Sequence, residues 1–124
     1  MTIKTNYIEE LNIIDSVFDE KATIEEMKQT VKESLLIAKQ HNSHRFLVDC
    51  SRLKKGGTIV QLYTLGDFYL DIDVMPGTKQ AIVLSDAPET QRDIRFYETA
   101  TRNRGFDVHV FSDRSSAIAW LLHE

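Results

Sequence analysis

The chain has 124 residues and a formal net charge of −4, with 42% hydrophobic and 27% charged residues. This length fits one domain, residues 1–124, and folding at this size buries roughly two-thirds of the unfolded chain's surface, enough for a core without disulfides. The composition is that of a globular protein and excludes a disordered chain. The negative charge argues against a nucleic-acid partner, because binding the phosphate backbone favours a basic protein.

A single cysteine, Cys50, cannot form an internal disulfide, which fits a reducing compartment. The first residues lack the apolar core of a secretion signal. No apolar stretch approaches the ~18 residues that a membrane helix needs. These features predict a cytoplasmic protein without a membrane span.

The N-terminal part of the chain predicts two short strands and a helix. Residues 4–9 and 13–18 have the partial alternation of strands, with a turn at residues 10–12. Thr23 and Glu26 are spaced as a capping box that starts the helix. The helix carries one apolar stripe: Ile24, Met27, Val31, Leu35 and Ala38. It ends at His41 and Asn42.

The middle of the chain predicts two buried strands separated by a helix. Residues 45–50 and 80–84 are short apolar runs, typical of strands covered on both faces. A loop at 51–57 follows the first of them, and Thr58 begins a helix over residues 59–72. Pro76 and Gly77 then mark a turn.

The C-terminal part predicts a helix, a strand and a last helix. Asp86 and Glu89 are spaced as a further capping box, and Pro88 suits the first turn. This helix runs to about Arg104 and stops at Gly105. Residues 108–111 form the last strand. Asp113 caps a final helix with four apolar residues: Ala117, Ile118, Trp120 and Leu121.

The predicted order is β-β-α-β-α-β-α-β-α, which indicates an α/β domain. Apolar strands that alternate with amphipathic helices favour a mostly parallel, five-stranded sheet with helices packed on it.

Three segments resemble the STAS domain of sulfate transporters and anti-sigma-factor antagonists, most closely its SpoIIAA-like branch of small bacterial proteins. They are Lys-Ala-Thr-Ile-Glu-Glu at 21–26, Phe-Leu-Val-Asp-Cys-Ser at 46–51, and residues 103–111 with the helix that follows. The resemblance implies a βα superhelix with strands in sequential order. It also implies either a partner-switching regulator or an apolar-ligand binder.

The chain departs from anti-sigma-factor antagonists at their phosphorylation site. Those proteins carry an Asp-Ser-Ser-Gly-like segment after the central strand, whereas residues 54–58 here read Lys-Lys-Gly-Gly-Thr. The acidic residue is missing, which argues against the usual partner switch. Thr58 is the hydroxyl at the matching place and is the candidate phosphorylation site.

The same loop is a candidate anion site. Gly56 and Gly57 let the backbone approach a ligand closely, and a helix that starts at Thr58 offers free N–H groups. The order is not that of a nucleotide-binding P-loop. The alternative is a solvated loop without a ligand.

Polar residues follow several of the predicted strands. Asp49 and Ser51 follow the central strand, and Ser85 and Asp86 follow the next one. One interpretation is the rim of a ligand site at the carboxyl ends of the parallel strands. The other is that these residues cap helices and turns.

The segment 59–72 has apolar residues all round its predicted helix axis. A helix of this kind is buried on all sides, and a domain of this size has little material to cover its second side. We therefore expect a homodimer through this helix, or a small apolar ligand against it. The alternative is that the domain's own loops cover it. The candidate contact residues are Leu62, Tyr63, Phe68 and Tyr69.

No catalytic constellation stands out. Cys50 lacks a neighbouring base in the sequence apart from His44 on the same strand. The histidines have no metal-ligand spacing, so we expect neither a metal nor a cofactor. The third predicted helix has a basic character from four arginines: Arg92, Arg95, Arg102 and Arg104. Asp93 and Glu98 lie between them in the sequence, which predicts a salt-bridged solvent face; an acidic partner protein is the alternative.

The sequence thus favours a non-enzymatic, STAS-like regulatory or protein-interaction module that self-associates through residues 59–72. A small apolar-ligand binder and a phospho-switch at Thr58 are the alternatives.

Overall fold

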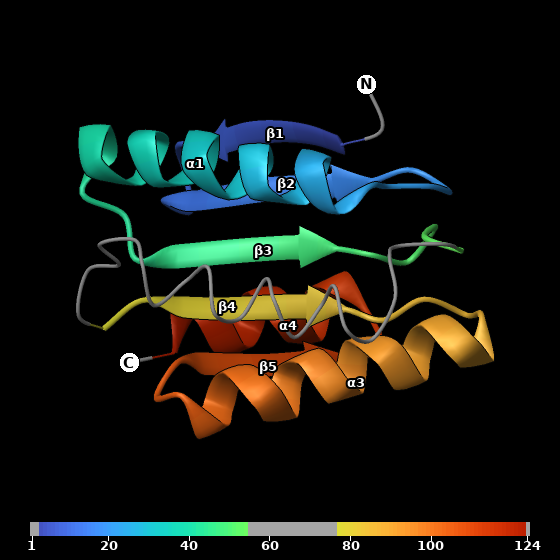
Figure 1. The fold of residues 1–124 in the computed structure, drawn as a ribbon. Helices are drawn as coiled ribbons and strands as arrows, with labels where there is room; N and C mark the ends of the chain where they lie inside the picture. Colours follow the sequence, from blue (N-terminus) through green and yellow to red (C-terminus); the bar gives the residue numbers. More distant parts are fainter. Residues whose placement is uncertain (1–2, 55–76, 124) are drawn as a thin grey trace.

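The computed structural model describes residues 3–54 and 77–123 (Figure 1). The expected helix at 59–72 and the last three residues of the loop before it, 55–57, lie outside these residues. The described strands are β1 (Ile3–Ile8), β2 (Ile13–Phe18), β3 (Arg45–Asp49), β4 (Lys79–Val83) and β5 (Asp107–Phe111). The described helices are α1 (Ile24–His41), α3 (Pro88–Asn103) and α4 (Arg114–Leu122).

The strands form one five-stranded sheet in the order β1-β2-β3-β4-β5. β1 pairs antiparallel with β2, and every later pair is parallel, which confirms the expected mostly parallel sheet and sequential strand order. The register places Asp15 beside Leu47 and Val17 beside Asp49. The predicted strands were right to within a residue at each end.

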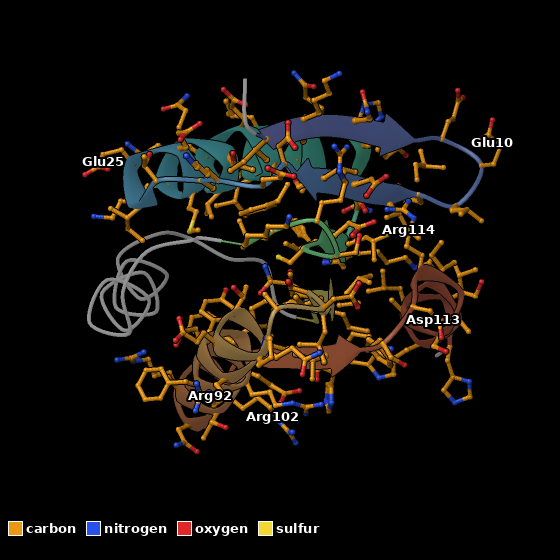
Figure 2. The ribbon with its side chains drawn as sticks, turned by 90° about the vertical axis from the view of Figure 1, so that its right-hand side faces the viewer. Glu10, Glu25, Arg92, Arg102, Asp113 and Arg114 are labelled. Carbon is orange, nitrogen blue, oxygen red and sulfur yellow. The ribbon has the colours of Figure 1, made fainter. Side chains whose placement is uncertain are left out.

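The helices lie on both faces of the sheet (Figures 1 and 2). α1 and α3 lie on one face, and α4 lies on the other. Alternate residues of each strand therefore enter two separate cores, because successive side chains point to opposite faces. Ile82 belongs to the α1/α3 core, whereas Ala81 and Val83 pack with Ala117 and Leu121 of α4.

The ends of α1 and α4 follow the predicted caps. Glu26 N–H donates to Thr23 Oγ1 at 3.1 Å, and Thr23 N–H donates to Glu26 Oε1 at 3.0 Å, which completes the capping box. Asn42 ends α1 in the left-handed conformation, with φ 52°. Ser116 N–H donates to Asp113 Oδ1 at 2.7 Å at the start of α4.

The predicted cap of α3 was wrong. The N-cap is Ala87, which makes no side-chain hydrogen bond, and Asp86 lies one residue before it. Pro88 explains the shift, because a proline holds the residue before it in an extended conformation, here with φ −73° and ψ 121°. Ser85 instead accepts the N–H of Ala87, at 3.1 Å.

The buried side of α1 is more polar than its sequence stripe suggested. Thr30 and Ser34 are buried together with Ile24, Met27 and Ala38. Val31 and Leu35 are only half-buried, so the helix is rotated toward its small hydroxyl residues.

Candidate functional site

The α1/α3 face of the sheet contains a cavity of about 150 Å³. The strands supply its floor, α1 one wall and α3 the other. Most of its described lining is apolar and includes these side chains: Ile14, Phe46, Val48 and Ile82 of the sheet, Val31 and Leu35 of α1, and Ile94 of α3. We call this space the α1/α3 groove.

A few polar groups interrupt the apolar lining of the groove. The hydroxyl of Tyr97 on α3 donates to Gln80 Oε1 on β4 at 2.9 Å. Thr90, at the other end of α3's inner face, donates to the carbonyl of Lys54 at 3.0 Å. A small number of placed polar groups in an apolar cavity can orient a ligand. The Tyr97–Gln80 pair is therefore the group best placed to do so.

The α4 face holds a buried cluster of charges instead. Asp15 of β2 and Asp49 of β3 are 7% and 6% exposed, and both contact Arg114 at the start of α4 (Figure 2). Arg114 Nη2 and Nη1 donate to the two carboxylate oxygens of Asp15 at 2.9 and 3.2 Å. Arg114 Nη1 also donates to Asp49 Oδ2 at 2.9 Å. One guanidinium thus joins two neighbouring strands to the helix.

Asp49, a predicted site residue, is fully engaged in this cluster. Its Oδ1 accepts the N–H of Ser51 at 2.9 Å. Burial alone would raise the pKa of Asp49, but the hydrogen bonds from Ser51 and the charge of Arg114 outweigh burial and hold that pKa below its usual value. The hydrogen bonds that Arg114 donates to Asp15 and Asp49 in turn raise the pKa of Arg114. The carboxylate of Asp49 therefore stays ionised.

The carboxyl ends of the strands form a shallow depression that includes Ser51 and Ser85. Ser85 donates to the carbonyl of Leu53, so its hydroxyl satisfies backbone groups on both sides. The cations of the depression are paired as well, since Arg52 lies 3.4 Å from Asp19 and Lys54 lies 3.6 Å from Glu20. Ser51 is exposed.

Cys50 is buried behind the α1/α3 groove. Burial raises the pKa of its thiol to about 12, with a further contribution from the charge of Asp49. The thiol is therefore protonated at neutral pH and is a poor nucleophile there. His109 faces the other side of the sheet, where its ring centroid lies 4.8 Å from that of Trp120.

The described residues contain neither a cluster of metal-binding side chains nor a helix suited to a membrane. In residues 3–54 and 77–123, no three side chains of the metal-binding types gather into a cluster. The helices in this part of the chain are too short or too polar to cross a membrane.

The remaining predicted site residues lie outside the described part of the chain: Gly56, Gly57, Thr58, Leu62, Tyr63, Phe68 and Tyr69. The proposals that involve them stay predictions from sequence.

Sequence reasoning missed Asp15 and Arg114. A signal for Asp15 was present, because a carboxylate amid Ile13, Ile14 and Val17 in a buried strand needs a cationic partner. Nothing in the sequence identified that partner, since Arg114 is 99 residues away.

The fold is similar to that of a known structure. An uncharacterized protein of the DUF3478 family from Shewanella loihica PV-4, with a SpoIIAA-like fold, matches with a TM-score of 0.50 and 17% sequence identity. The match covers 96% of this chain and 91% of that chain. No protein-family model and no curated protein matches the chain. The protein therefore has a SpoIIAA-like fold, as the sequence resemblance implied.

Proposed function

We propose that the protein is a non-catalytic binding module whose α1/α3 groove takes a small apolar ligand. The observation that carries this proposal is the apolar lining of the groove with the Tyr97–Gln80 hydrogen bond inside it. Dry apolar cavities of about this volume bind molecules the size of benzene. Each buried methylene contributes about 0.8 kcal/mol, so a ring or a short acyl chain gives useful affinity.

Two features support a binding role over catalysis. The thiol of Cys50 is buried and protonated, and the carboxylate of Asp49 is held by Arg114 and Ser51. These are the groups that an enzyme hypothesis would have used. We also infer a cytoplasmic location, which rests on the single cysteine of the chain.

Native mass spectrometry of freshly purified protein tests the ligand proposal. The proposal expects a co-purifying adduct or, on addition of toluene or hexanoate, a rise in the melting temperature. Val48→Phe fills the groove and removes both effects, whereas Leu36→Phe on the outer side of α1, where Leu36 is 63% exposed, leaves them unchanged. A wild-type protein that shows neither an adduct nor a shift contradicts the proposal.

The second candidate function is protein interaction. The partner is either a second copy of the chain, in a homodimer, or a regulatory protein. It is favoured by the apolar sequence of residues 59–72, especially Leu62, Tyr63, Phe68 and Tyr69. Sedimentation of the wild type as a dimer and of Phe68→Glu as a folded monomer supports it. A wild type that stays monomeric at all concentrations rules out the homodimer.

A phospho-switch at Thr58 would act within this second function. Phosphorylation would place negative charge beside Lys54 and Lys55, which is electrostatically favourable. Intact mass analysis after incubation with kinase fractions tests it, with Thr58→Ala as the control. An unmodified wild type, or equal modification of Thr58→Ala, excludes the switch.

A further inference from the structure

The outer side of α3 carries three arginines that lack acidic partners. Arg92, Arg95 and Arg102 are exposed. Among the described residues, the structure places no carboxylate within ion-pair distance of any of them. Figure 2 shows Arg92 and Arg102 on the outside of α3, at the opposite end of the molecule from Glu10 and Glu25.

For Arg92, Arg95 and Arg102 the salt bridges predicted from sequence are therefore wrong among the described residues, and the packing of α3 shows why. Glu98 Oε2 accepts the backbone N–H of Val110 at 2.8 Å, so this carboxylate is used by β5. Asp93 is half-buried and lines the α1/α3 groove. Both of these carboxylates are thus directed toward other parts of the fold.

The helix geometry aligns the three cations. At 100° per residue, Arg92, Arg95 and Arg102 fall within an arc of about 80°, and Arg92 and Arg102 are about 15 Å apart along the axis. The buried residues Ile94 and Tyr97 point the opposite way. Phe96, 37% exposed, borders the same arc. We call this surface the α3 arginine face.

We propose that the α3 arginine face docks an acidic segment of a partner protein. Guanidinium groups bind carboxylates through paired hydrogen bonds, and arginine and aromatic residues carry much of the affinity of protein interfaces. A segment with carboxylates spaced over about three helical turns complements this face. The site is separate from the α1/α3 groove, which lies on the other side of the same helix.

The observations favour a protein over a nucleic acid or a membrane. The chain's net charge of −4 repels the long, dense charge of a nucleic acid. A membrane surface requires a broad apolar face, whereas Phe96 is the large hydrophobic residue of α3 that is exposed. A short acidic segment, in contrast, can bind through contacts with the α3 arginine face alone.

Fluorescence anisotropy with a labelled peptide of about 12 glutamate, alanine and leucine residues tests the proposal. We expect binding that weakens as salt rises. The triple change Arg92→Glu, Arg95→Glu, Arg102→Glu should weaken binding at least about tenfold. The control Lys4→Glu, Lys21→Glu, Lys39→Glu alters three exposed lysines by the same total charge and should weaken it about twofold or less.

Several results would overturn the proposal. One is equal weakening by the two triple variants, which would show a response to net charge alone. Others are no peptide binding by the wild type, or arginine-dependent binding to phosphatidylserine vesicles or duplex DNA in place of the peptide. Circular dichroism establishes that each variant is folded. Val48→Phe should keep peptide binding, so failure of the groove proposal and failure of this one are distinguishable.

Discussion

The two faces of the sheet differ in how closely the described helices pack on them. On one face, the single helix α4 packs closely, with Ala117 and Leu121 at 0% and 2% exposure, and Arg114 ties it to β2 and β3. On the other face, α1 and α3 flank a groove with half-buried Val48 on its floor. A tightly packed face tolerates little change, whereas a face with a cavity has room for a ligand. The candidate function therefore belongs to the α1/α3 face.

The largest expected effect contrasts enlarged side chains on the two faces. Ala117→Leu should lower the free energy of unfolding by about 3 kcal/mol, because Ala117 is fully buried in the cluster with Ala81 and Leu121 and added atoms must displace these neighbours. Val48→Phe should cost under about 1 kcal/mol, since the groove accepts the ring. Urea unfolding of both variants measures the difference. Equal losses would mean that the two faces are packed equally well.

The second-largest expected loss of stability follows from removing the cation Arg114 from the α4 face. Arg114→Leu leaves the buried carboxylates of Asp15 and Asp49 without their partner, and we expect a loss of about 2 kcal/mol, reduced from the fully buried case because Arg114 is 39% exposed. The matched control is Arg102→Leu, which should change stability by less than about 0.5 kcal/mol. Indistinguishable unfolding curves would show that the cluster does not hold α4 in place.

The same cluster should make the α4 face sensitive to acid. The pKa of Asp49 is lower in the folded than in the unfolded protein, so its ionised form stabilises the fold at pH values above its ordinary pKa. This contribution is lost as the pH falls below about 4, through the folded-state pKa. Unfolding measured from pH 7 to pH 2 should show a smaller acid-dependent loss in Asp49→Asn than in the wild type. An identical pH profile would remove Asp49 from the explanation.

The smallest expected effect is a gain in stability. His44 Nδ1 is buried and has no hydrogen-bond partner among the described residues, which costs free energy. His44→Leu should raise the free energy of unfolding by about 0.5 to 1 kcal/mol. Differential scanning calorimetry compares it with His123→Leu, an exposed control that should have little effect. A loss of stability would indicate that the ring makes a needed contact.

Much of the fold could be predicted because local rules determine it. The capping box of α1, the apolar strands and the order of the described elements all depend on residues close in sequence, such as Thr23 with Glu26. The cap at α3 failed because Pro88 constrains its neighbour more strongly than Asp86 attracts the helix end. Even there the error was one residue.

The site was harder to predict because it depends on distant contacts. Arg114 finds Asp15 through the packing of α4 on the sheet, and Glu98 faces Val110 through the packing of α3 against β5. Neither pair is visible as a sequence motif. The spacing of charges along a helix does not predict which carboxylates will accept hydrogen bonds from other elements of the fold. For this reason the arginines of α3 were expected to form salt bridges.

The hydrogen bond from Val110 to Glu98 has a consequence for how copies of this protein can meet. β5 is an outer strand of the sheet, and the free backbone groups of such a strand invite pairing with a strand of another molecule. Glu98 already occupies the donor at Val110. A strand of a neighbouring molecule could pair with β5 at this position only after the charge-assisted hydrogen bond between Val110 and Glu98 breaks. This edge of the sheet therefore resists fibre-like aggregation.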